Sequence, residues 1–207
     1  MVVKKLSILT DAVKKLEDKI FGSGCDHGTV SLKKTPLLKI CPYVKGECIT
    51  VSYGGKTCEM ATSHPVEVAT KISFMYGKPL NSPVQRTAAC AIVNVLSNFM
   101  CFIRVARPCD ESSHADCLNE LKTEIGESKV YLNGNLPGLF GKIQENVVDS
   151  PDDADIIVVS GDGLFDDEKL AITENYRDIK RLIFTGPATA GVCLMENLEH
   201  WCPYGKR

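Results

Sequence analysis

The chain has 207 residues, of which 44% are hydrophobic and 24% are charged, and its formal net charge is −2. These values are ordinary for a globular protein, and they exclude the basic surface that general nucleic-acid binding needs. No signal peptide or membrane span is expected, since the most apolar stretch, residues 88–106, contains Asn94, Asn98 and Arg104. Ten cysteines are unusual, and without an export signal they predict reduced thiols in a cytoplasmic protein.

The first hundred residues mix helical and strand patterns. Apolar residues at helical spacing, together with capping residues, predict three helices, at residues 6–21, 63–77 and 84–100. Alternating patterns and a Gly-Gly turn predict four strands: Thr29–Lys33, Leu37–Cys41, Cys48–Tyr53 and Lys56–Met60. This half is expected to form a small α+β domain, residues 1–100.

After Met100 the pattern changes to short apolar runs separated by helices. The runs are Phe102–Ala106, Lys129–Leu132, Ile156–Ser160 and Leu182–Thr185. The helical stretches are Ser113–Ile125, Leu136–Gln144, Asp166–Tyr176 and Ala190–Leu198. Strands that are buried on both faces and alternate with helices are typical of a parallel sheet. The expected fold class is therefore α/β, with a Rossmann-like, doubly wound parallel sheet over residues 101–207.

Loops rich in glycine and small polar residues follow three of these runs. The carboxyl ends of parallel strands meet at one edge of a sheet, where ligands bind in doubly wound folds. The predicted ligand-binding residues are Asn133, Gly134, Gly161, Asp162, Asp166, Gly186 and Thr189. The two aspartates oppose a bare phosphate, so the expected ligand is cationic, metal-bound or rich in hydroxyl groups. The alternative is that these small residues only make tight turns.

Cysteine and histidine residues early in the second half could bind a metal. Cys109, His114 and Cys117 are soft ligands at plausible spacing, the last two lying one helical turn apart. The set lacks the paired C-x2-C pattern of structural zinc sites, so unliganded thiols are the alternative. The sequence does not identify a cofactor, and the candidate for one is a transition metal bound by these residues.

No motif assigns a reaction. The sequence contains neither the G-x-S-x-G elbow of serine hydrolases nor the G-x-x-x-x-G-K-[ST] loop of P-loop nucleoside triphosphatases. G-x-G-x-x-G is also missing from the three loops, which disfavours dinucleotide binding. Whether the protein is an enzyme is left open.

Several segments resemble the heavy-metal chelation family, a family of unknown function. The segments are Tyr76–Leu80, Gln85–Asn98, Lys129–Leu139, Ala154–Gly161 and Gly186–Thr189. The resemblance implies an N-terminal domain like that of enolase, joined to a Rossmann-like domain, with a ligand site in the cleft between them and a role in metal handling. The chain departs from the family at residues 162–166, which make its loop more acidic, and in the short stretch between Leu139 and Ala154.

The leading functional hypothesis is a metal- or metallocofactor-handling protein with a ligand cleft between two domains. The alternative is a small-molecule enzyme of cofactor metabolism that uses a nucleotide or S-adenosylmethionine-like ligand. A regulatory or scaffold protein without chemistry of its own is the third. The expected partner is a small-molecule or metal ligand, with neither nucleic acid nor membrane, and a homo-oligomer is left open.

Overall fold

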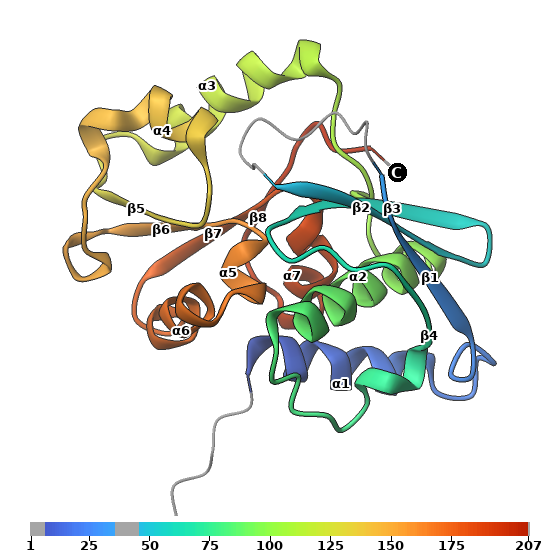
Figure 1. Cartoon of the computed structure of the whole chain (residues 1–207). Helices are drawn as coiled ribbons and strands as arrows, with labels where there is room; N and C mark the ends of the chain where they lie inside the picture. Colours follow the sequence, from blue (N-terminus) through green and yellow to red (C-terminus); the bar gives the residue numbers. More distant parts are fainter. Residues whose placement is uncertain (1–6, 36–45, 207) are drawn as a thin grey trace, which may run out of the picture.

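The computed structural model describes residues 7–35 and 46–206, and within them it shows a mixed α/β protein with two four-stranded sheets (Figure 1). The first sheet is antiparallel, in the order β3-β2-β1-β4, and the second is parallel, in the order β5-β6-β7-β8. Within these ranges, no helix combines the length and the apolar character needed to cross a membrane. The predicted α/β class, with a parallel sheet in the second half, is thus confirmed.

The antiparallel sheet lies in the first half, with two helices packed beside it. Its strands are β1 (Thr29–Lys34), β2 (Glu47–Tyr53), β3 (Lys56–Thr62) and β4 (Val68–Lys71). The helices are α1 (Ile8–Ile20) and α2 (Pro83–Phe99). β2 and β3 form the predicted hairpin, and Gly54 and Gly55 make its turn with φ values of 55° and 78°. The predicted strand Leu37–Cys41 lies outside the described residues.

The helix predicted for residues 63–77 was wrong. This stretch forms strand β4 and a short 3-10 helix, Ile72–Met75, in place of an α-helix. β4 pairs with β1, with Val30 opposite Thr70. The local cap and proline pattern favoured a helix, but the open edge of β1 needed hydrogen-bond partners, and the β-branched Val68 and Thr70 suit a strand.

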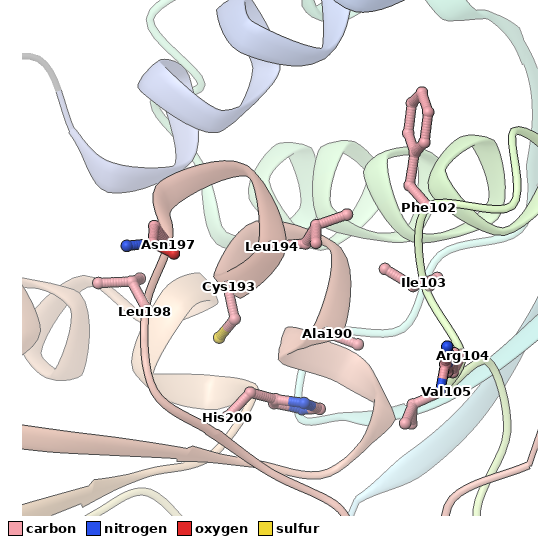
Figure 2. Close-up of a pocket in the computed structure, with 10 residues that line it drawn as sticks. All are labelled: Phe102, Ile103, Arg104, Val105, Ala190, Cys193, Leu194, Asn197, Leu198 and His200. Atoms are coloured by element: carbon pink, nitrogen blue, oxygen red, sulfur yellow. The ribbon is translucent and has the colours of Figure 1, made fainter.

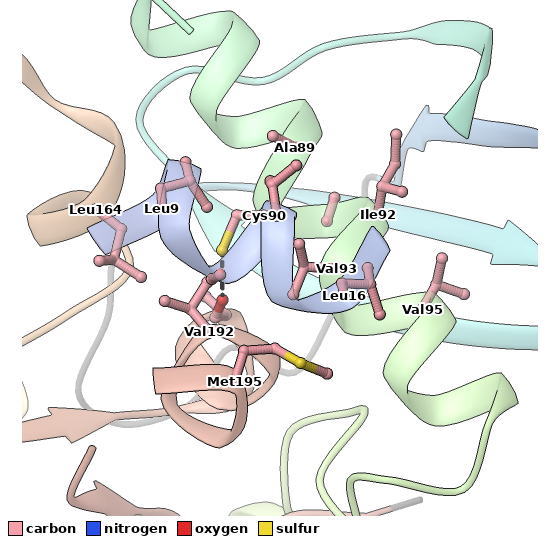
Figure 3. Close-up of a cluster of buried hydrophobic side chains, with 14 of the residues drawn as sticks. Leu9, Leu16, Ala89, Cys90, Ile92, Val93, Val95, Leu164, Val192 and Met195 are labelled. Carbon is pink, nitrogen blue, oxygen red and sulfur yellow. Dashed lines mark hydrogen bonds between the residues drawn. The ribbon is translucent and has the colours of Figure 1, made fainter. Parts of the chain in front are cut away.

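Helix α2 is the centre of the molecule. Ser82 caps it through the Gln85 N–H at 3.3 Å, and the Gln85 side chain accepts from the Ser82 N–H. All side chains from Arg86 to Asn98 are buried, because α2 packs against the antiparallel sheet, α1 and α7. Figure 3 shows Cys90 and Val93 of α2 between α1 and α7. The sequence predicted one buried stripe, whereas the structure buries every face of this helix.

The parallel sheet is covered on both faces. Its strands are β5 (Val130–Asn133), β6 (Ile156–Val159), β7 (Arg181–Thr185) and β8 (His200–Trp201). The helices are α3 (His114–Ile125), α4 (Pro137–Ile143), α5 (Asp162–Phe165), α6 (Asp167–Tyr176) and α7 (Ala190–Glu196). Val158 and Ile183 face the core with α3 and α4, whereas Val159 and Phe184 face the core with α1, α2 and α7. The latter core crosses residue 100, and the domain boundary there stays a prediction.

The strand predicted at Phe102–Ala106 was wrong. This segment is an irregular linker, because the N–H groups of Phe102 and Ile103 bond to the carbonyl of Ser97 at the end of α2. The N–H of Ala106 bonds to the carbonyl of Lys206. The fourth place in the parallel sheet is taken instead by β8, where Thr185 pairs with Trp201.

The segment that follows α4 runs along the other edge of β5. Val147 makes a single parallel bridge to Val130, and the Val148 N–H donates to the Val130 carbonyl at 2.9 Å. Val130 also pairs with Ile156 of β6, so the two partners lie on opposite edges of β5.

Candidate functional site

The structure brings together the three loops predicted to bind a ligand. The Ser160 N–H donates to the Asn133 carbonyl at 3.2 Å, which joins the first loop to the second. A Cβ placed on Gly161 would lie 2.8 Å from the Cβ of Ala188, which shows how closely the second loop meets the third. The loops therefore share one edge of the parallel sheet, as the strand order requires.

The third loop is buried against the first half of the chain. The Thr189 hydroxyl is fully buried and donates to the carbonyls of Thr185 and Gly186, so it closes its own turn. The Ala188 carbonyl accepts from Cys90 and Asn94 of α2. Ala188 thus holds this loop against α2, and the hydroxyl of Thr189 is used within the turn itself.

Asp162 is also engaged with the first half. Its carboxylate is 1% exposed and accepts from the backbone N–H of Ser63 at 3.2 Å and from the Ser63 hydroxyl at 2.8 Å. Gly161 is buried beside it. Ser63 lies in the loop that follows β3, so this loop supplies the hydrogen bonds that the buried carboxylate needs.

The first loop and the end of β6 hold two polar atoms without partners. Asn133 is 1% exposed, and its amide nitrogen donates to the Lys169 carbonyl and the Thr173 hydroxyl at 2.8 and 2.9 Å. Its Oδ1 atom, and the Oγ atom of the fully buried Ser160, have no hydrogen-bond partner among the described residues. Gly134 passes close by with a φ of 136°. Buried polar groups are normally paired, so two such atoms on adjacent strands mark a candidate ligand site.

His64 and Asp166 lie at the rim of this edge. His64 Nε2 is 3.6 Å from Asp166 Oδ2, and the side chains are 28% and 27% exposed. The Asp166 Oδ1 atom accepts from the N–H groups of Glu168 and Lys169 and so caps α6. Burial alone would raise the pKa of Asp166, but these N–H groups, the Lys169 ammonium and His64 together lower it. The carboxylate is therefore ionised at neutral pH.

Sequence reasoning missed His64 as a site residue. It belongs to the stretch that was predicted as a helix, and the pairing with Asp166 spans 102 positions of the chain. Its Nε2 atom has no hydrogen bond to the described residues. No local pattern signals such a pair, because it forms only when the end of β3 meets the edge of the parallel sheet.

The predicted metal ligands lie around the start of α3. Cys109 and Cys117 are 4% and 3% exposed, and the buried Nε2 atom of His114 has no hydrogen-bond partner in the part of the chain that the structure describes. Burial first, and then the neighbouring Cys117, raise the pKa of Cys109. Across the described chain, no three His, Cys, Asp or Glu side chains form a group that could hold a metal ion. The structure does not support a preformed site here, and the ligand set stays a prediction.

Cys202, in the C-terminal segment, lies near these two thiols. The spacing of cysteines in the sequence could not show this proximity. Burial, then Cys117 and Cys109, raise its pKa to about 12, so the thiol is protonated at neutral pH. The antiparallel bridge between Arg107 and Lys206 holds the two segments together. Nine cysteines are described, all as free thiols, and seven of them are buried.

A cavity of about 320 Å³ lies between the linker and α7 (Figure 2). Phe102 and Arg104 line one side, and Cys193 and His200 line the other. His200 Nε2 is 2.9 Å from the Gly186 carbonyl, and burial lowers the pKa of the ring, so the neutral imidazole donates this bond. This space lies beside the edge loops, and no sequence pattern indicated it.

The chain matches no protein-family profile and no curated protein. Among solved structures, it resembles a protein of unknown function of the DUF364 family from Pyrococcus horikoshii, with a TM-score of 0.46 and 15% sequence identity. The alignment covers 87% of this chain and 79% of that chain. The relation is too distant to assign a function.

Proposed function

We propose that this protein handles a small metal-bearing ligand, of the metallocofactor type, and binds it where the parallel sheet meets the first half of the chain. The observation that carries the proposal is a pair of buried atoms, Asn133 Oδ1 and Ser160 Oγ, which lie at the ends of β5 and β6 and have no hydrogen-bond partner among residues 7–35 and 46–206.

The topology of the parallel sheet favours a ligand site at the carboxyl ends of β5 and β6. Counting the Val147 bridge as a rudimentary strand, the segments run in the order Val147, β5, β6, β7, β8. The direction of winding then reverses between β5 and β6, and this reversal supports the proposal of a doubly wound, Rossmann-like sheet. Ligands of such sheets bind at the carboxyl ends of the strands where the order reverses. Asn133 and Ser160 flank this point.

The polar atoms define what the ligand must offer. Asn133 Oδ1 is an acceptor and needs a donor, whereas the Ser160 hydroxyl both donates and accepts. A ligand with hydroxyl or amine groups satisfies both, and filling them removes the cost of leaving buried polar atoms unpaired.

His64 and Asp166 have the chemistry and the spacing of metal ligands. Two atoms that bind the same metal ion at about 2.1 Å lie roughly 3.0 Å apart at adjacent octahedral positions, and in tetrahedral geometry they lie roughly 3.4 Å apart. The observed 3.6 Å between His64 Nε2 and Asp166 Oδ2 is close to the tetrahedral value and too long for a hydrogen bond. Since no third ligand gathers here among the described residues, the remaining positions on the metal would come from the small molecule.

A nucleotide or S-adenosylmethionine-like ligand is the second candidate. It is favoured by the same two atoms, because ribose hydroxyls both donate and accept hydrogen bonds. This function needs Asn133 and Ser160 but does not need His64, and that difference separates the two proposals.

Calorimetric titration with cobalt(II)-nitrilotriacetate, a complex with two open coordination positions, tests the first proposal. We expect binding to the native chain and a loss of affinity of about tenfold or more in His64→Ala and Asp166→Asn. Nitrilotriacetate without metal should not bind. Parallel titrations with adenosine and S-adenosylmethionine, on the native chain and Ser160→Ala, test the second candidate.

His27→Ala is the matched control, because His27 is an exposed histidine in the segment between α1 and β1, outside the loops that form the sheet edge. Equal affinity of the cobalt complex for the native chain, His64→Ala and His27→Ala would contradict metal handling at this site. Binding of adenosine compounds that depends on Ser160 alone would support the second candidate instead. Thermal unfolding of each variant shows whether a loss of binding reflects a loss of folding.

A further inference from the structure

A second, more polar cavity lies on the other side of the linker. It has a volume of about 640 Å³, within the range of small-molecule sites. The turn of the β2–β3 hairpin, the end of α2 and the linker form its walls. Its lining includes Lys56, Thr57, Asn98, Arg104 and Arg107. None of these residues belongs to the sheet-edge site described above.

Packing holds the walls of this cavity in place. The rings of Tyr53 and Phe99 meet edge to face, with 5.0 Å between their centres, and this contact fixes the hairpin against α2. Gly54 packs closely against the ring of Phe99, since a Cβ added to Gly54 would lie 2.4 Å from that ring. The Asn98 amide donates to the Thr57 carbonyl at 3.3 Å. The cavity is therefore bounded by ordered elements rather than by a loose loop.

The cavity concentrates positive charge. Its described lining contains three cationic side chains, those of Lys56, Arg104 and Arg107, and no carboxylate. The exposed Arg104 side chain makes no hydrogen bond or ion pair within the described chain, whereas Arg86 and Arg181 each pair with a carboxylate. The guanidinium of Arg104, which no carboxylate of the described chain balances, attracts an anion from solution.

We propose that this cavity binds the oxyanion group, phosphate or carboxylate, of a small organic molecule. Arg104 and Arg107 offer planar, multi-donor guanidinium groups, which recognise oxyanions with paired hydrogen bonds. Lys56 adds a third charge from the hairpin, and the Thr57 and Asn98 side chains add polar groups. This site is separate from the sheet edge, and its chemistry is opposite, because the edge carries Asp162 and Asp166.

Titration with pyrophosphate and with citrate tests the proposal, and the two arms separate a phosphate ligand from a carboxylate ligand. We expect at least one of them to bind, with affinity that falls as salt rises. Arg104→Gln and Lys56→Gln should each weaken that binding by about tenfold, as expected when a charged partner of an anion is removed. Lys129→Gln, which removes an exposed cation beside the start of β5, is the control and should bind like the native chain.

Cys101 provides a second measurement that reports location. It is the exposed cysteine among those described, and it lines this cavity. The bound anion should slow alkylation of Cys101 by N-ethylmaleimide, read by peptide mass spectrometry, in the native chain and in Lys129→Gln. Absence of binding by both anions, equal weakening in Lys129→Gln, or binding that leaves Cys101 unprotected would each overturn the proposal.

Discussion

The side-chain oxygen of Asn94 accepts a 2.7 Å hydrogen bond from the backbone N–H of Gly191, which lies 97 positions later in the chain. The amide nitrogen of Asn94 donates to the carbonyls of Pro187 and Ala188 at 3.2 and 2.9 Å. A Cβ on Gly191 would lie 2.6 Å from Asn94 Oδ1, so the close approach requires glycine. One buried amide of α2 thus ties the first half of the chain to the start of α7.

We expect Asn94→Ala to lower the free energy of unfolding by roughly 2–4 kcal/mol, because it leaves a buried N–H and buried carbonyls unpaired and opens a cavity. Urea denaturation measures this change. Asn175→Ala, at an exposed position of α6, is the control and should stay within about 0.5 kcal/mol of the native chain. An Asn94→Ala variant as stable as the control would show that the bonds of Asn94 do not hold the halves together.

Gly134 should be intolerant of a side chain. A Cβ there would lie 1.9 Å from Ser160 Oγ and 2.9 Å from Ser160 Cβ, and the φ of 136° is one that other residues rarely adopt. We expect Gly134→Ala to lower the free energy of unfolding by roughly 2–3 kcal/mol. Adding Ser160→Gly removes the colliding atoms and should recover part of this loss, leaving the backbone strain.

Gly141→Ala is the matched control for this experiment. Gly141 lies in α4, and a Cβ there would meet no atom within 4 Å. Alanine favours a helix over glycine, so the control should gain roughly 0.5–1 kcal/mol in thermal or urea unfolding. Equal effects of the two glycine substitutions would contradict the close contact between Gly134 and Ser160.

Stability should fall at alkaline pH because of the thiol of Cys58. Burial raises its pKa from 9.0 to about 12, with smaller lowering effects from Asn98 and Arg107, and the side chain is 2% exposed. The folded state therefore keeps this proton above the pH at which the unfolded chain releases it. The stabilisation is complete below pH 9.0 and is lost as the pH rises towards about 12, at up to roughly 1.4 kcal/mol per pH unit.

Urea denaturation between pH 8 and pH 11 checks this prediction, since it gives the free energy of unfolding at each pH. Cys58→Ala should make the alkaline decline less steep without removing it, because the pKa of the Cys202 thiol is also raised to about 12. The smaller side chain at position 58 lowers stability at every pH. Cys101→Ala, which removes an exposed thiol, should leave the slope unchanged. An unaltered slope in Cys58→Ala would assign the decline to other groups.

Local patterns in the sequence determined most of the elements. The amphipathic spacing of α1, the Gly54–Gly55 turn of the hairpin and the capping box of α2 act within a few residues, so the sequence shows them directly. The apolar runs of β5, β6 and β7 likewise indicate a parallel sheet. Since parallel strands share an edge, the meeting of their loops could also be predicted.

Only the tertiary structure decided the remaining elements and the contacts between distant residues. These features depend on which strand edges and helix faces remain open once other elements have packed. The free edge of β1 turned an expected helix into β4, and the bonds of the linker to Ser97 gave the fourth place in the parallel sheet to β8. The same packing buried Thr189 and left His64 facing Asp166 across 102 positions. Contacts between residues so distant in sequence leave no periodic trace, so only the folded chain shows them.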